Sequence, residues 1–453
     1  METPPALTTL RVRPFDPTGR LVRLAMLGFA FLLPFLSWGQ AMGIALLALL
    51  FNAYLLPEFR AAKGPPEPGS AWTARFGTRE ALYTVSLLLV LLIFRHSEIV
   101  VAAVWGILAA GNFAAETVGS AWSEPALPWN PEKTLAAGAS FTVAGTAAAY
   151  VLSRWVAPTV PADRTFFICL ATSFVGALAA TAPLRLDNHL TVALAASGFM
   201  FCALYIQQSA LDSNAPYLGV RIVLALLVNA LFALLAWVLR FATRSGALAG
   251  FVLGVTIYMG YGWKSFLILL GFFALASVAT RLGYAKKASR GIAERQGGAR
   301  SWREAGANLL AAAFFSILVI TTHREAAFLA ALVAALAEAA GDTVSSEIGK
   351  WLSEQAYLLT TLEPVPSGED GGISFPGSLA GVGASVVIAA LSVAVGLCRP
   401  GVAAWVLAAA VAGNLLDSLL GATLERRGCL NNSAVNLAGT SFAGALTLAV
   451  MLR

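Results

Sequence analysis

Long apolar segments alternate with short polar segments along most of the chain. Because a helix needs about 20 largely apolar residues to cross a lipid bilayer, each apolar segment predicts a transmembrane span. The predicted spans are 21–38, 40–56, 81–95, 97–114, 134–154, 165–182, 189–208, 218–240, 246–261, 264–281, 305–321, 325–341, 377–397, 401–421 and 433–452. The pattern therefore predicts an all-α, polytopic integral membrane protein with about 15 transmembrane helices, several of them short.

The Lys and Arg residues lie mainly in loops that are separated by an even number of predicted spans. These loops are the N-terminal segment before residue 24 and the segments 57–80, 282–304 and 425–427. Since loops rich in Lys and Arg stay in the cytoplasm, we expect a cytoplasmic N-terminus in a multi-pass protein of a prokaryotic cytoplasmic (inner) membrane. The same side receives the polar segments 111–133, 183–188, 342–376 and 422–432. The arginine-rich start is also typical of secretory signals, but no convincing small-residue cleavage site follows, so we expect a retained first helix.

The composition excludes several classes of protein. Hydrophobic residues make up 58% of the chain and charged residues only 12%, whereas a soluble domain has about 25% charged residues. The net charge of +6 comes from residues in short loops between apolar segments, which membrane orientation explains without a nucleic-acid partner. Four cysteines without close spacing and three scattered histidines argue against a zinc site, a disulfide framework or a histidine metal cluster.

Two segments in different halves of the chain share an order of polar features. GNFAAETVG (Gly111–Gly119) and GDTVSSEIG (Gly341–Gly349) each follow an Ala-rich span, precede a polar loop with prolines, and lead into a span rich in Gly, Ala and Ser. Small residues also recur by chance in closely packed helices, but the agreement of three features in one order favours a repeat. We therefore predict N-terminal membrane helices over 1–74 and two related halves over 75–215 and 216–453.

The C-terminal half places acidic and small residues on shared helix faces. The spacing of three to four residues puts Glu338, Asp342 and Gly349 on one face, and Asn414, Asp417 and Glu425 on another. Carboxylates and amides without His or Cys favour Mg²⁺, which binds one or two carboxylates together with substrate phosphates. The further candidates around this site are Ser346, Lys350, Asp370, Gly371, Gly372, Asn432 and Asn436, with the glycine backbone and Lys350 suited to phosphate. This inventory fits phosphoryl or nucleotidyl transfer.

Most of these residues also have a structural interpretation. Asp342 can end a helix near the membrane surface, Glu338 can pack between helices, and Lys350 can be a membrane-surface anchor. The segment 369–372 can be only a turn. Asp417 lies deeper in an apolar run, where an acid is functional by default.

The first half offers a weaker set of the same kind. Asn112 stands where the second half has Asp342, and Glu116 follows one turn later. Lys133 lies at a predicted helix start, and Asp187 lies close to His189. The alternatives are a membrane-surface anchor for Lys133, a helix N-cap for Asp187 and an interfacial polar group for His189.

These stretches resemble two known families. GNFAAETVG, KTLAAG (Lys133–Gly138) and LDNHLTVAL (Leu186–Leu194) resemble the phytol kinase and dolichol kinase group, which is related to the phosphatidate cytidylyltransferases, over about 75–210. AGDTVSSEIG, PSGEDGGISFPGSLAG and DSLLGATLERRG with NNSAVN resemble the family that contains the plant phytyl-phosphate kinase, over about 235–453.

The resemblance implies a fusion of two lipid kinases that use Mg²⁺ and a nucleoside triphosphate, often CTP, with ATP as the other candidate, on an isoprenoid lipid. It implies a metal–nucleotide site at Asp342, Ser346 and Glu347, joined by Asp370 and Asp417. In the first half it implies similar work for Glu116, Lys133 and Asp187. The first half departs from its pattern at Asn112, Asn188 and His189, so the implied activity rests mainly on the second half.

Two other functions fit parts of the same pattern. A cytidylyltransferase that makes a CDP-activated lipid would use the same cation and phosphate groups. A transporter would also show repeats and polar groups on broken helices, but its site would lie near the middle of the membrane, whereas most of the acids cluster toward one side.

Overall fold

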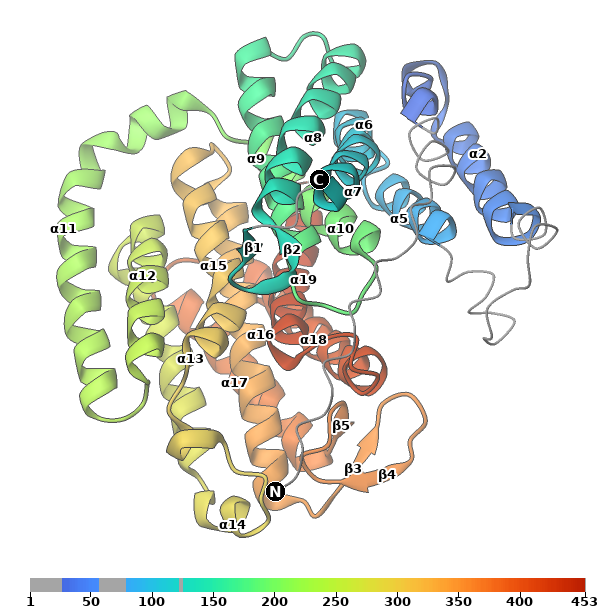
Figure 1. Ribbon diagram of the computed structural model, residues 1–453. Helices are drawn as coiled ribbons and strands as arrows, with labels where there is room; N and C mark the ends of the chain where they lie inside the picture. Colours follow the sequence, from blue (N-terminus) through green and yellow to red (C-terminus); the bar gives the residue numbers. More distant parts are fainter. Residues whose placement is uncertain (1–26, 57–78, 122–124, 453) are drawn as a thin grey trace. The chain divides into compact units, whose positions relative to one another are not determined.

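Figure 1 shows the computed structural model, which describes residues 27–56, 79–121 and 125–452. The chain divides into two compact units, Met1–Phe201 and Cys202–Arg453. The helices of the first unit are α2 (Trp38–Leu50), α5 (Arg79–Ile93), α6 (Glu98–Gly106), α7 (Asn112–Ala121), α8 (Leu135–Val156), α9 (Ala162–Thr181) and α10 (Asn188–Ala203), which crosses the unit boundary. Those of the second are α11 (Gln208–Val238), α12 (Arg244–Tyr261), α13 (Trp263–Arg281), α14 (Tyr284–Ser289), α15 (Trp302–Thr321), α16 (Glu325–Leu352), α17 (Phe375–Ala394), α18 (Pro400–Leu420) and α19 (Asn432–Met451).

The prediction of a nearly all-α membrane protein is confirmed. The described residues contain 11 helices long and apolar enough to cross a membrane, and each corresponds to a predicted span. The spans predicted over 81–95 and 189–208 are the shorter apolar helices α5 and α10, and α12 covers the span predicted over 246–261. The predicted total of about 15 spans is not confirmed, and the predicted division at residues 74 and 215 stays a prediction.

One predicted helix is wrong. A single helix over 21–38 does not form in the part described, because Pro34 sits in a short 3-10 turn (Leu33–Phe35) and Ser37 then caps α2. Helix α16 runs past the predicted span 325–341 to Leu352 as one 28-residue helix. The residues Glu338, Asp342 and Gly349 therefore lie on one helix, as their predicted spacing requires.

Helix α8 is central in the first unit, where it packs against α6, α7 and α9. Its N-cap Thr134 accepts a hydrogen bond from the backbone N–H of Ala137 (3.1 Å). Thr134 also ends the short strand β2 (Asn130–Thr134), which pairs antiparallel with β1 (Ala126–Leu127). The polar loop of the first half is thus a small hairpin between two helices.

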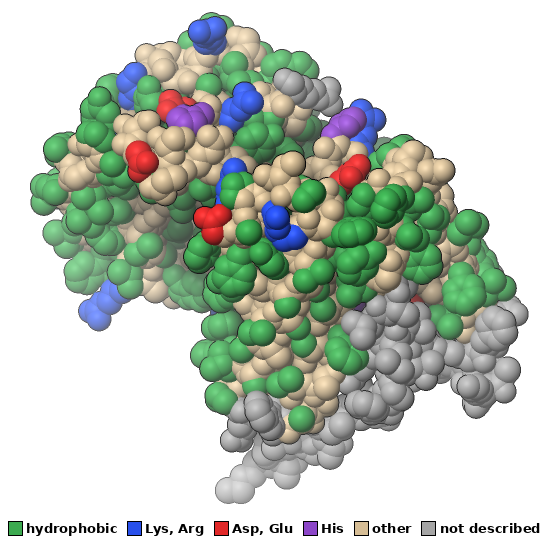
Figure 2. Space-filling model, turned by 90° about the horizontal axis from the view of Figure 1, so that it is seen from above, with side chains coloured by type: hydrophobic (Ala, Val, Ile, Leu, Met, Phe, Trp, Pro, Cys, Tyr) green, Lys and Arg blue, Asp and Glu red, His purple; other side chains and the backbone are tan. Residues whose placement is uncertain are grey.

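Helix α16 is central in the second unit and is buried along most of its length. It packs against α13, α15, α17, α18 and α19, and its Ala-rich sequence lets all of these helices approach closely. Helix α11, by contrast, is mostly exposed and presents an apolar surface suited to lipid. Figure 2 shows few charged side chains among broad hydrophobic areas on the visible face.

Helices α16 and α17 meet through glycines. A Cβ atom on Gly377 would lie 2.5 Å from the carbonyl oxygen of Ser345, and one on Gly381 would lie 2.7 Å from that of Gly341. Ser385 further along α17 donates a hydrogen bond to the carbonyl oxygen of Ala337 (2.9 Å). The contact is therefore backbone against backbone, and it fixes where the acidic face of α16 lies.

Replacing Gly381 with alanine is expected to destabilise the protein by about 1–3 kcal/mol, because the added methyl group overpacks this contact. Gly383 on the same helix is the matched control, since a Cβ atom there meets nothing within 4 Å. Gly383→Ala should be neutral or slightly stabilising. Thermal unfolding of both variants in detergent checks the prediction, and equal unfolding temperatures would contradict the close packing.

The loops at the C-terminal end of α16 form one polar assembly. Strand β3 (Gln355–Leu358) pairs antiparallel with β4 (Pro364–Pro366) and with β5 (Gly372–Ile373), in the order β4-β3-β5. The hydroxyl of Ser367 donates to the carbonyl oxygen of Gly349 (3.2 Å) and so ties this sheet to α16. Helix α14 packs against the same end of α16. The basic loop (residues 282–304) and the acidic loop (residues 353–374) therefore lie together, as the predicted topology requires.

Candidate active site

Carboxylates from α16 and α18 face one another across the second unit. Glu338 and Asp342 lie one turn apart on α16, and both interact electrostatically with Asp417 of α18. Gly413 brings α18 close, because a Cβ atom there would lie 2.7 Å from Cγ of Glu338. Thus Asp342 and Asp417, which the resemblance joined in one metal–nucleotide site, lie close enough to interact.

The acidic loop extends this cluster toward the end of the helices. Gly371 has a positive φ of 71°, and its backbone lies against Gly421, where a Cβ atom would be 2.8 Å from the Gly371 nitrogen. Only glycine combines this conformation with such close approach. The contact places Asp370 near Glu425, and these two carboxylates also interact.

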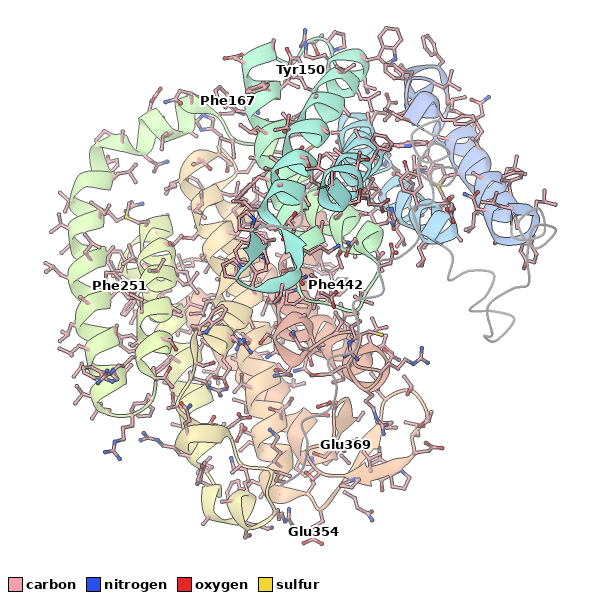
Figure 3. All side chains as sticks on the ribbon, in the orientation of Figure 1. Tyr150, Phe167, Phe251, Glu354, Glu369 and Phe442 are labelled. Atoms are coloured by element: carbon pink, nitrogen blue, oxygen red, sulfur yellow. The ribbon has the colours of Figure 1, made fainter. Side chains whose placement is uncertain are left out.

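Cations lie next to the acids at the loop end. Lys350 and Arg300 both attract the carboxylate of Asp342, and Arg426 lies 3.5 Å from Glu369. Glu369 lies at the loop end in Figure 3. Asp370 is exposed as a residue. Partial desolvation of the Asp370 carboxyl group, and then the neighbouring charge of Glu369, raise the pKa of Asp370. The site therefore combines several acids with a smaller number of positive charges.

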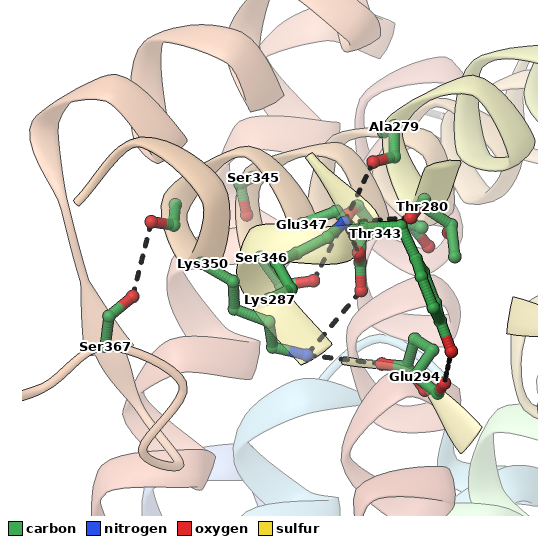
Figure 4. A network of polar contacts seen from close by, with 12 residues as sticks. Ala279, Thr280, Lys287, Glu294, Thr343, Ser345, Ser346, Glu347, Lys350 and Ser367 are labelled. Carbon is green, nitrogen blue, oxygen red and sulfur yellow. Dashed lines mark hydrogen bonds and ion pairs between the residues drawn. The ribbon is translucent and has the colours of Figure 1, made fainter. Parts of the chain in front are cut away.

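A buried ion-pair network holds α14 and its following loop against α16 (Figure 4). Lys287 is wholly buried and pairs with Glu347, while Lys350 lies 3.6 Å from Glu347 and 3.2 Å from Glu294. Burial opposes ionisation of Glu294, but Lys350 and Arg300 outweigh it and lower the pKa of Glu294. The network fixes the position of Lys350 beside Asp342.

The lowered pKa of Glu294 predicts a pH-dependent contribution to stability. Its ionised form is favoured in the folded protein, so the contribution is present above the unfolded pKa and is lost as pH falls through the folded value, below about 4.5. Glu294→Gln is therefore expected to lower the unfolding temperature at neutral pH, with a difference that shrinks toward acidic pH. Thermal unfolding across pH checks this, and a difference that grows on acidification would contradict it.

Some predicted site residues have other partners. The carboxylate of Glu347 pairs with Lys287 and Lys350. Gly349 allows the close contact with α17, because a Cβ atom added there would lie 2.9 Å from Oγ of Ser374. Ser346 is exposed and donates to the carbonyl oxygen of Thr343 (3.1 Å). Asn432 is exposed at the first turn of α19 and Asn436 is half-buried one turn later. The roles predicted for all of these residues, and the phosphate binding predicted for Gly371 and Gly372, stay predictions.

Two of the residues predicted in the first half bond within their own helix or at its start. Asn112 is buried and its amide donates to the carbonyl oxygen of Leu108 (3.0 Å) in its own helix. Asp187 accepts a hydrogen bond from the backbone N–H of His189 (2.9 Å) and contacts its ring at 2.7 Å, which confirms the N-cap interpretation. Glu116 and Lys133 are half-buried, and their catalytic roles stay predictions.

Sequence reasoning missed several contributors. It used Lys287 and Arg300 only among the cations of the loop 282–304 that set the orientation, and it gave no role to Glu294. The two glutamates Glu294 and Glu304 within the basic loop 282–304 were the available signal, because acids among clustered cations often form ion pairs. Glu338 was left between packing and function, and it turns out to be 1% exposed at the centre of the cluster.

The donors present suit Mg²⁺ held jointly with phosphate. In the part of the chain that the structure describes, no three His, Cys, Asp or Glu side chains lie close enough to hold a metal ion by themselves. Mg²⁺ needs only one or two carboxylates when substrate phosphates complete its shell. Oδ2 of Asp417 is buried and finds no hydrogen-bond partner among the described residues, so it is free to accept a ligand.

Comparison with known proteins places the second unit. Residues 227–444 match the family model described as integral membrane protein DUF92. An uncharacterized membrane protein of Synechocystis is 36% identical over 203 residues (44% of this chain, 78% of the relative). An uncharacterized membrane protein of Methanocaldococcus jannaschii is 33% identical over 231 residues, which are 50% of this chain and 92% of the relative. Protein VTE6, chloroplastic, of Arabidopsis thaliana is 32% identical over 213 residues, which are 46% of this chain and 64% of the relative. No solved structure shows a significant match. The chain therefore belongs to the DUF92 family of integral membrane proteins.

Proposed function

We propose that the chain is an integral-membrane isoprenoid kinase whose second unit transfers the γ-phosphoryl group of a nucleoside triphosphate, CTP rather than ATP, to a prenyl or phytyl monophosphate. The observation that carries the proposal is the convergence of Asp342, Asp417, Glu425 and Asp370 at one end of the helices, beside Lys350 and Arg426. These residues come from three separate segments. The resemblance of the same segments to the phytyl-phosphate kinase family supports the reaction.

The residues divide the work of phosphoryl transfer between them. Asp342 and Asp417 would hold Mg²⁺, which would neutralise phosphate charge, and Asp370 would close the site from the loop. Lys350 and Arg426 would attract the remaining phosphate oxygens. An oxygen of the acceptor phosphate attacks the γ-phosphorus, a new P–O bond forms, and the nucleoside diphosphate leaves as the bond to the bridging oxygen breaks. Positioning and charge neutralisation supply most of the rate.

The positions of the charges support a cytoplasmic site. The cations Arg290, Arg300, Lys350 and Arg426 lie at the same end of the second unit as the acidic loop. Loops rich in Lys and Arg stay in the cytoplasm, where nucleoside triphosphates are available. The prenyl chain would lie between helices in the bilayer with its phosphate at this end.

An order of elements common to the two units supports a repeat. In both units a helix (α7 in the first, α16 in the second) precedes a small β structure, and a helix with a Ser or Thr N-cap follows (Thr134 for α8, Ser374 for α17). We propose that the first unit is a related domain that binds the isoprenoid chain. Its own kinase activity toward the free alcohol is less well supported, because Asn112 replaces an acid and is bonded within its helix.

A single assay with labelled nucleotide tests the proposed reaction. Purified protein in detergent is incubated with Mg²⁺, CTP or ATP carrying a γ-label, and phytol or phytyl monophosphate in separate tubes. Label in the diphosphate from the monophosphate is the expected result, and label from phytol as well would mean that the first unit is also active. Release of pyrophosphate instead of CDP would replace the kinase by a cytidylyltransferase, because attack would then fall on the α-phosphorus.

A further inference from the structure

Glu338 occupies an unusual position that the proposed reaction does not use. It lies at the midpoint of the 28-residue helix α16 and is 1% exposed. Both of its carboxylate oxygens are buried, and neither has a hydrogen-bond partner within the described residues. A buried charge without a partner is costly, and within a membrane an acid of this kind marks a binding site by default.

The helices around Glu338 are shaped to receive its carboxylate. Gly413 of α18 and Gly439 of α19 both face it, and a Cβ atom on Gly413 would lie 2.7 Å from its Cγ. A Cβ atom on Gly439 would collide with the carboxylate itself. Larger residues at either glycine would fill the cradle, so three helices together leave a space for this one polar group.

A second polar group without a partner points to the same place. Asn414 follows Gly413 on α18, and a Cβ atom on Gly341 would lie 3.8 Å from its Nδ2. This Nδ2 atom is buried and makes no hydrogen bond to any described residue. The amide is therefore not locked and can turn its oxygen toward a ligand. Glu338 and Asn414 thus offer oxygen donors from two helices.

The charges that act on Glu338 are all negative. They are Asp342 on its own helix and Asp417 on α18. Helices α17 and α19 contain no charged residue, the charged residues of α13 and α15 lie in their end turns, and Lys287 of α14 is paired with Glu347. Lys350 and Arg300 act on Asp342. Among the described residues no cation faces Glu338, so an ionised carboxylate there would be balanced by an ion from solution.

We propose that Glu338 and Asn414 form a site for a monovalent cation, Na⁺ or K⁺, at the middle of the helix bundle, one turn inside the proposed Mg²⁺ ligand Asp417. A monovalent ion suits a site with few acids, since no group of three is close enough to hold a metal ion in the described chain. The site lies deeper than the nucleotide site and does not depend on the kinase reaction. A bound cation would neutralise Glu338 next to Asp417 and would stabilise the packing of α16, α18 and α19.

Thermal unfolding of the full-length protein in detergent tests this proposal. Unfolding is measured in NaCl, KCl and choline chloride at equal ionic strength, without nucleotide or Mg²⁺. The expected result is a higher unfolding temperature in Na⁺ or K⁺ than in choline, rising with ion concentration as linkage requires. Glu338→Gln should abolish the difference. Glu325→Gln, at the exposed first turn of the same helix, should keep it.

Equal unfolding temperatures of the wild-type protein in all three salts would overturn the proposal. If stability then changed only with pH, Glu338 would be a protonated carboxyl group and not a cation ligand. A cation-dependent shift that survives in Glu338→Gln would also overturn it. Should that variant fail to fold, Asn414→Ala is measured in the same way, and an undiminished shift in it would contradict the assigned donors.

Discussion

Replacing Asp417 with asparagine is expected to lower Mg²⁺-dependent phosphoryl transfer by about 10²–10³-fold, the loss typical of removing one electrostatic group from a reacting centre. The change keeps the size of the side chain and removes its charge. Oδ2 of Asp417 has no hydrogen-bond partner in the described residues, so the substitution breaks no internal bond there. Asp342→Asn should cause a loss of similar size. Steady-state rates with γ-labelled nucleotide and phytyl monophosphate measure both.

The matched control for these variants is Glu325→Gln. Glu325 lies at the exposed first turn of α16, away from the cluster, and its replacement should leave the rate unchanged. Unfolding temperatures near that of the wild-type protein would show that Asp417→Asn is folded. Wild-type turnover by Asp342→Asn or Asp417→Asn would remove these residues from the site.

Replacing Lys287 with methionine is expected to destabilise the protein by about 3–5 kcal/mol, the usual cost of breaking a buried ion pair by removing one partner. The ammonium of Lys287 also donates to the carbonyl oxygens of Ala279 (3.2 Å) and Thr280 (2.9 Å) at the end of α13. The substitution therefore leaves Glu347 buried without its main partner. Thermal or denaturant unfolding in detergent measures the effect.

Lys286 is the matched control, because it is exposed on the same short helix. Lys286→Met should change stability little. The double variant Lys287→Met, Glu347→Gln should recover part of the lost stability, since no unpaired buried charge remains. Together with the two single variants it forms a double-mutant cycle that gives the interaction energy of the pair. A Lys287→Met variant as stable as Lys286→Met would mean that the network does not hold α14 to the bundle.

The sequence predicted the parts of the site that depend on helical spacing. The spacing predicted which residues share a face with Asp342 on α16 and with Asp417 on α18, and the resemblance implied that these two residues join one site. The shared location of the basic and acidic loops also followed from counting spans. By contrast, the pairing of Lys287 with Glu347 joins residues 60 positions apart, and no local pattern encodes such a contact.

The span predicted over 325–341 covers only the apolar part of α16. Polar residues after Gly341 indicated a membrane boundary, yet α16 continues to Leu352 because its polar side chains find partners in α14, in the following loop and in α18. Tertiary ion pairs and electrostatics of this kind override local hydropathy. The three-stranded sheet of the acidic loop was not predicted either, because its strands have only two to four residues.

The central claim is that the carboxylates at the loop end of α16 and α18 bind a metal–nucleotide complex. The most direct measurement is the affinity of purified full-length protein for CTP and ATP, titrated with and without Mg²⁺, for the wild-type protein and for Asp342→Asn with Asp417→Asn. The account predicts saturable binding that requires Mg²⁺ and is lost in the double variant but kept in Glu325→Gln. Binding that needs no Mg²⁺, or that is unchanged in the double variant, would contradict it.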